Sequence, residues 1–166
     1  MYNDIVERAA FEPFSDLSGV LSGLPIRVFP VGTFYRGERK LTVTKDRLQQ
    51  FAANVKAGLP RFAIPINIEH KDEMGSYGTV EDLEYIEQGI QGPGLYATKY
   101  QLTDEGRKLL EQEKFIGLSG EAIWTLFDGA KYQDPQTGRE HDNVLVGLAL
   151  TNKPFFGKEV NLYSAF

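Results

Sequence analysis

The segment Val144–Thr151, VLVGLALT, most restricts how this chain can fold, because it is nearly all apolar. It is far too short for a transmembrane helix, which needs about 20 apolar residues. A continuous apolar run of this length is typical of a β-strand buried on both faces. The rest of the chain must therefore supply a sheet around this strand and cover it on both sides.

Short strand-like runs separated by turn residues recur along most of the sequence. They are expected at residues 26–29, 41–44, 62–69, 80–86, 94–102, 116–127 and 144–151. Glycines and a proline between residues 87 and 94 predict a hairpin connection. Asp128-Gly129 predicts a turn, and residues 134–143 predict a polar loop. The pattern favours an α+β, mainly β fold: a bent β-barrel of about six to seven strands flanked by helices.

Two helices are expected among the strands. Thr44 has the character of an N-cap, and Leu48, Phe51, Ala52 and Val55 follow at the spacing of one helix face. Gly58 and Pro60 should end this helix. Thr103 should cap a second helix over about residues 104–114, with Leu109 and Leu110 turned inward.

The composition is that of one ordinary globular domain of 166 residues, with 42% hydrophobic and 25% charged residues. The net charge of −5 and the lack of a basic stripe argue against a nucleic-acid partner. The chain has no cysteine, which excludes disulfides, thiolate metal sites and cysteine catalysis. Neither a membrane span nor a secretory signal is visible, so we expect a cytosolic protein.

His70 and Ser119 are the first candidates for chemistry, because the chain holds only two histidines. A serine hydroxyl becomes a useful nucleophile when a base such as imidazole takes its proton. In a regular strand, His70 would share a face with Ile66 and Ile68, with Asn67 and Glu69 opposite. On the later strand, Ser119, Glu121 and Ile123 would share a face, with Gly117 and Gly120 allowing close approach of a substrate backbone.

Such a pair also needs a group behind the imidazole and donors for an oxyanion. Glu121, His141 and Asp142 are the candidates for the third catalytic member, and strand geometry favours Glu121, because it lies beside Ser119. The turn after the last strand offers backbone amides and a cation for the oxyanion, at Asn152 and Lys153.

Several plainer interpretations compete with this one. A serine between glycines and a histidine at a strand end are more often ordinary structural residues. Glu69, His70 and Asp72 could instead ligate a metal, but no second histidine at helical spacing supports this. We therefore expect neither a metal nor a cofactor, and these features alone do not assign an enzyme.

The order of the motifs carries more information than any single motif. IPINIEHK is followed by GTVEDLEYI, then GLYATKYQLTDEGRKLL, FIGLSGEAIW and LVGLALTNKP. This series, over about residues 26–160, resembles the prohead maturation proteases of tailed phages, especially the protease–scaffold I proteins of Mu-like prophages. The resemblance implies an assemblin-like serine protease fold, with His70 as catalytic histidine, Ser119 as nucleophile and an oxyanion segment near Asn152 and Lys153.

The resemblance also implies what the protein acts on and where. Such endopeptidases cleave scaffold and major capsid proteins inside the procapsid, in the cytoplasm of the bacterial host, and self-associate or join the procapsid. We expect a lead-in over residues 1–25, a protease domain over 26–160 and a tail over 161–166 that stops before a scaffold region. The third catalytic residue of the family has no clear counterpart here. In the family it lies on, or just before, the strand that corresponds to residues 144–150, and that strand is entirely apolar in this chain. A catalytically inactive scaffolding or binding module with the same fold is the alternative.

Overall fold

The structure, a computed structural model, describes residues 8–13, 21–112 and 117–152. Within them, seven strands form one sheet in the order β1-β8-β11-β5-β6-β7-β2. The strands of this sheet are β1 (Arg8–Pro13), β2 (Ile26–Pro30), β5 (Ile64–Ile68), β6 (Gly78–Ile86), β7 (Gly94–Leu102), β8 (Gly117–Ile123) and β11 (Val144–Thr151). Two small hairpins stand outside it: β3 (Gly32–Arg36) with β4 (Arg39–Val43), and β9 (Tyr132–Gln133) with β10 (Glu140–His141).

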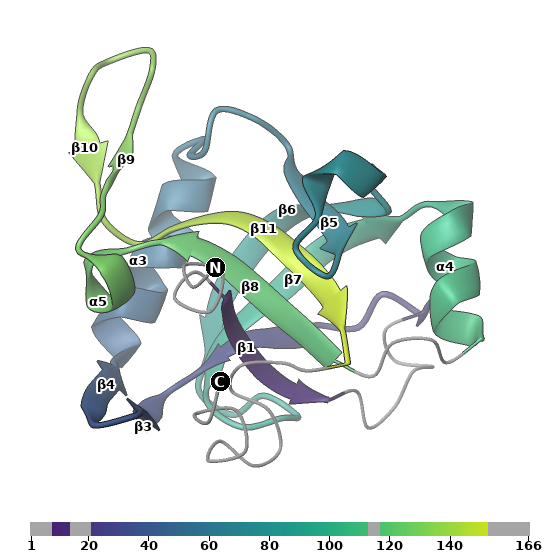
Figure 1. Cartoon of the computed structure of the whole chain (residues 1–166), viewed down its shortest axis with the longest axis horizontal. Helices are drawn as coiled ribbons and strands as arrows, with labels where there is room; N and C mark the ends of the chain where they lie inside the picture. Colours follow the sequence, from purple (N-terminus) through teal and green to yellow (C-terminus); the bar gives the residue numbers. More distant parts are fainter. Residues whose placement is uncertain (1–7, 14–20, 113–116, 153–166) are drawn as a thin grey trace.

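The large sheet curls until its two edge strands meet. β1 contacts β2, although the two lie at opposite ends of the strand order, so the sheet forms a nearly closed barrel (Figure 1). β11 lies inside this sheet, antiparallel to β8 and parallel to β5. Seven of its eight residues are buried, as its apolar sequence predicts. The mainly β, barrel-like fold class is therefore confirmed.

Aromatic side chains fill one part of the barrel core. The Trp124 ring lies 4.9 Å from Phe29, 5.0 Å from Phe51 and 4.8 Å from Phe127 between centroids. These offset and edge-on arrangements are favourable for aromatic rings. Leu118 and Ala122 of β8 point into the same core, so the opposite face of β8 is left for Ser119 and Glu121.

The described helices include α3 (Lys45–Lys56), α4 (Asp104–Glu111), the short α5 (Thr125–Asp128) and η1 (Asp72–Met74), a 3-10 helix of three residues. The two expected N-caps are confirmed: Thr44 accepts a bond from Arg47 N, and Thr103 accepts one from Gly106 N. α3 packs against β6, β7 and β11, with Leu48, Phe51 and Ala52 buried.

Three local expectations were wrong. The strand expected to reach residue 127 ends at Ile123, because the chain turns there into α5. The expected polar loop contains β10, which pairs with β9. Gly120 does not serve the approach of a substrate: a Cβ there would lie 2.6 Å from Phe29 Cε1, so the glycine makes room for the aromatic core.

Candidate active site

The candidate site lies on the face of the sheet opposite the core, where β8, β11 and β5 run side by side. Ala149 of β11 pairs with Ser119 on one side and with Asn67 on the other, so these three residues form a row across the strands. Glu121 lies two residues from Ser119 on the same face of β8. Ser119 of β8 and the strand β5, which leads to His70, therefore lie on either side of Ala149, a small residue.

His70 reaches this face through a turn, and the expected strand parity was wrong. β5 ends at Ile68, and Glu69 and His70 both have positive φ, 53° and 62°. Lys71 N donates to Ile68 O at 2.9 Å, which closes a turn of type I′ character. The reversal takes His70 away from the core side of Ile66 and Ile68.

The His70 ring is held by a carboxylate on its Nδ1 side. His70 Nδ1 and Glu121 Oε2 are in hydrogen-bond contact, and the two side chains are only 8% and 14% exposed. Because Glu121 accepts at Nδ1, it favours the tautomer that leaves Nε2 free to act as a base. Of the three candidates for the third position, Glu121 is the one that the structure places on His70.

The two atoms that would react are both buried and unbonded. In the described part of the chain, neither Ser119 Oγ nor His70 Nε2 has a hydrogen-bond partner, and Ser119 is 0% exposed. Buried polar atoms are usually paired, so each of these two free atoms needs an explanation. Catalytic hydrogen bonds are often long before substrate binds, so the open pair is compatible with a resting site.

Asn67 joins the parts of the site, although the sequence suggested only that it faces away from His70. Its side chain is fully buried. Asn67 Oδ1 accepts from His70 N at 3.2 Å, and Nδ2 donates to Glu121 Oε2 at 3.1 Å and to Asp72 Oδ1 at 3.0 Å. Its position opposite Ala149 was not predictable without the strand order.

An apolar depression of about 390 Å³ lies beside Glu121. Its walls are Phe62, Pro65, Ala122, Ile123, Tyr132 and Val146, and Asp72 and Glu121 also line it. The hairpin β9–β10 contributes Tyr132, whose hydroxyl accepts from Arg61 N at 3.1 Å. Arg61 also donates twice to Asp134, at 3.0 and 2.8 Å, and these hydrogen bonds hold the pKa of Asp134 far below its usual range.

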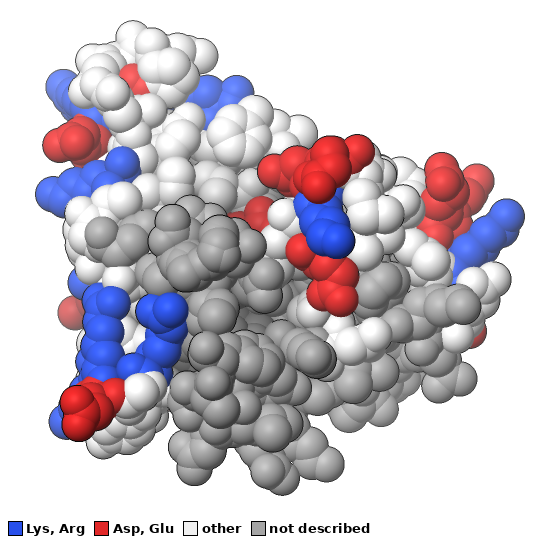
Figure 2. Space-filling model, in the orientation of Figure 1, with Lys and Arg blue, Asp and Glu red and all other residues white. Residues whose placement is uncertain are grey.

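The surface next to the site is acidic. Figure 2 shows acidic side chains over η1 and the turn before it, where Glu69, Asp72 and Glu73 are exposed, with Lys71 among them. Across the described ranges, no three histidine or acidic side chains lie together in a way that could hold a metal ion. The metal site considered for Glu69, His70 and Asp72 therefore has no geometric support.

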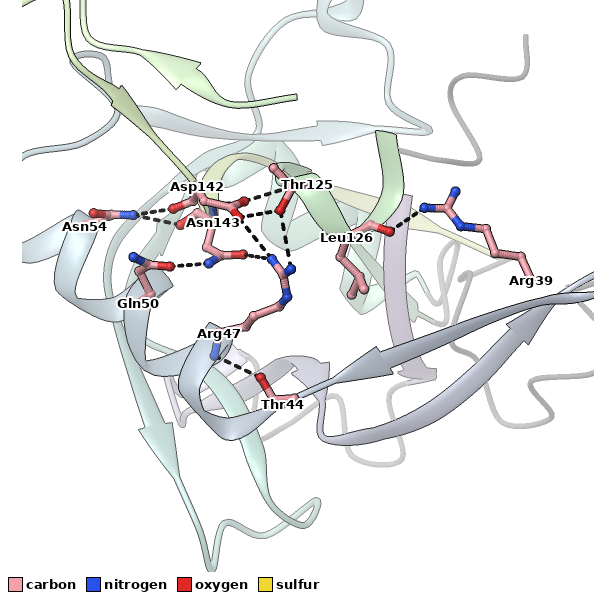
Figure 3. Close-up of polar contacts among 9 residues, drawn as sticks. All are labelled: Arg39, Thr44, Arg47, Gln50, Asn54, Thr125, Leu126, Asp142 and Asn143. Atoms are coloured by element: carbon pink, nitrogen blue, oxygen red, sulfur yellow. Dashed lines mark hydrogen bonds and ion pairs between the residues drawn. The ribbon is translucent and has the colours of Figure 1, made fainter. Parts of the chain in front are cut away.

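Asp142 and His141 lie elsewhere in the fold. The Asp142 carboxylate accepts from Thr125 N at 2.8 Å, from the Thr125 hydroxyl at 2.5 Å and from Arg47 at 3.3 Å (Figure 3). Burial alone would raise its pKa, but the Thr125 bonds and the Arg47 charge lower it below its ordinary value. Asp142 thus ties α3 to α5, while His141 forms part of β10 and pairs with Tyr132.

The expected oxyanion segment is described only in part. Asn152 is exposed and follows Thr151, the residue of β11 that pairs with Gly117. Lys153 lies outside the described residues.

Comparisons with protein-family models, with curated proteins and with solved structures found no match to this chain. Among the described residues, no helix is long and apolar enough to cross a membrane.

Proposed function

We propose that this chain is a serine endopeptidase, with Ser119 as nucleophile, His70 as general base and Glu121 as the group that orients His70. One observation carries the proposal: Glu121 holds His70 at Nδ1, while Nε2 and Ser119 Oγ are both left without a partner on the same side of the sheet. Acyl transfer needs a nucleophile, a base and an orienting carboxylate in this order, and the His70–Glu121 contact supports the last two roles.

In the proposed reaction, His70 Nε2 takes the Ser119 proton as the hydroxyl oxygen attacks a peptide carbonyl. Glu121 stabilises the imidazolium that results, and His70 then protonates the leaving amine. In the second half of the reaction, His70 takes a proton from water as the water attacks the acyl-enzyme, and it then returns a proton to Ser119. Backbone amides near Asn152 and Lys153 would face the oxyanion.

The motif order of the sequence supports a narrower assignment. On that resemblance, the substrates are the scaffold and major capsid proteins of a phage, cleaved inside the procapsid during prohead maturation. Self-association or incorporation into the procapsid would bring enzyme and substrate together.

The test is labelling by a fluorophosphonate probe, with the modified residue located by mass spectrometry. We expect modification of Ser119 in the wild type and none in Ser119→Ala or His70→Ala. Cleavage of a phage scaffold protein should fall by about 10⁶-fold in either variant. Cleavage at the wild-type rate by Ser119→Ala would refute the assignment.

One observation favours a second function, a catalytically inactive scaffolding or binding module. Ser119 is completely buried, and in the described contacts it makes no hydrogen bond to His70. This alternative predicts that Ser119 is never labelled while the fold is intact. Labelling that disappears in His70→Ala would exclude it.

A further inference from the structure

Asn67 makes hydrogen bonds to both His70 and Glu121, the general base and the orienting carboxylate of the proposed mechanism. It lies in β5, directly across β11 from Ser119, and it is fully buried. A buried amide must satisfy its polar atoms within the protein, because each buried group left unpaired destabilises the fold. All three partners of the Asn67 side chain, His70, Glu121 and Asp72, belong to the candidate site or border it.

The two ends of the amide do different things. The oxygen accepts the backbone N–H of His70, which fixes the position of the left-handed turn. The nitrogen has two hydrogens, and Glu121 and Asp72 each lie within reach of it, at 3.1 and 3.0 Å. A single side chain therefore locates both the histidine backbone and the carboxylate that meets the histidine ring.

The turn itself needs such support. Glu69 and His70 both adopt positive φ, which is unfavourable for a residue with a side chain and persists only when its surroundings enforce it. Besides the Asn67 bond, Glu69 N donates to Leu150 O at 3.0 Å. Of these two bonds, the Asn67 bond is the one made to the His70 backbone.

We propose that Asn67 is a positioning residue that holds His70 and Glu121 in register with each other. This inference rests on the proposed function for its effect on catalysis, but the geometry that it explains can be measured without any substrate. The amide donor to Glu121 is the essential part, because an acceptor alone could still hold the His70 N–H.

The test uses two variants, Asn67→Ala and the nearly isosteric Asn67→Asp. The aspartate keeps the oxygen that accepts from His70 N, but an oxygen replaces the NH₂ donor, so a third carboxylate lies beside those of Glu121 and Asp72. Asn54→Ala is the matched control, because the Asn54 side-chain amide also donates two hydrogen bonds, to the carbonyls of Asp142 and Asn143, but lies away from the site. Melting temperature by circular dichroism follows the stability of each variant.

The readout is the downfield NMR proton of His70 Nδ1–H, in protein labelled with ¹⁵N-histidine. His141 is the only other histidine, so His70→Ala assigns the signal. We expect the signal in the wild type and in Asn54→Ala, and its loss in both Asn67 variants. Probe labelling of Ser119 should fall about 10²-fold in the Asn67 variants, as expected for a misplaced base.

A signal retained in Asn67→Asp, or absent from the wild type, would overturn the inference. If the signal follows the expected pattern while Ser119 is unreactive in every protein, the proposed function fails but the role of Asn67 stands.

Discussion

Gly147 of β11 pairs with Glu121 of β8, and a Cβ on Gly147 would lie 2.1 Å from Glu121 Oε1. The glycine therefore leaves the space that the carboxylate occupies on its way to His70. A bulge between Leu145 and Gly147 sets this register, and bulges often re-aim side chains beside functional sites.

Gly147→Ala should displace Glu121 from His70 and reduce probe labelling of Ser119. Overpacking of this kind costs about 1–3 kcal/mol, which a melting curve should show. Gly138→Ala is the control, because Gly138 has φ 76° but open space around it. That variant should lose about 1 kcal/mol from backbone strain and keep full labelling. Equal labelling by both variants would show that the position of Glu121 is unimportant.

Glu121→Gln should separate the charge of this side chain from its shape. The amide can fill the same space, but it cannot stabilise an imidazolium as a carboxylate does. In a serine protease triad the corresponding change lowers kcat by about 10⁴, so we expect a loss of that order in scaffold cleavage. Glu81→Gln, which removes an exposed partner of Lys99, should have no effect. Full activity of Glu121→Gln would remove Glu121 from the mechanism.

Asp142→Asn should destabilise the protein in a pH-dependent way. Because the folded-state pKa of Asp142 is below its ordinary value of 3.8, its charge stabilises the fold above that pH and stops doing so as the pH falls further. We expect a loss of about 2 kcal/mol at pH 7 that shrinks below about pH 4. Urea unfolding at pH 7 and pH 3 measures it, with Glu38→Gln as the exposed control. A pH-independent difference would contradict this account.

Removal of residues 1–13 should increase the labelling of Ser119. β1 pairs with β8 with Ala10 opposite Ser119, so it occupies the strand edge that an extended substrate would use for main-chain hydrogen bonds. Removal of residues 1–7 alone keeps β1 and should leave the rate unchanged. Slower or equal labelling by the longer deletion, with the fold intact, would argue that β1 does not compete with substrate.

The sequence predicted those parts of the fold whose signals are local. The caps at Thr44 and Thr103 and the apolar run of β11 each depend on neighbouring residues, and all three were confirmed. Strand parity also correctly separated the Ser119 face of β8 from the core face. The β9–β10 pairing was missed, because β10 is only two residues long and its polar sequence gives no periodicity.

The site was less predictable, because its parts meet through strand order and an unusual turn. Glu69 gives no signal for positive φ, and the enrichment of histidine at positive φ is too weak to predict a turn here. Parity therefore placed His70 with the core residues of β5, when the turn carries it to the other side. The role of Asn67 was missed because Glu121 lies 54 residues away and its nearer partners, His70 and Asp72, lie in a turn that was not predicted.

Trp124 is the only tryptophan in the chain, and it is fully buried among Phe29, Phe51 and Phe127 at the end of the strand that carries Ser119. Its intrinsic fluorescence is therefore a one-residue optical reporter of the barrel interior. A variant that keeps the blue-shifted emission of Trp124 would still have an intact aromatic core behind β8. A lost activity could then be assigned to chemistry, with no label added to the protein.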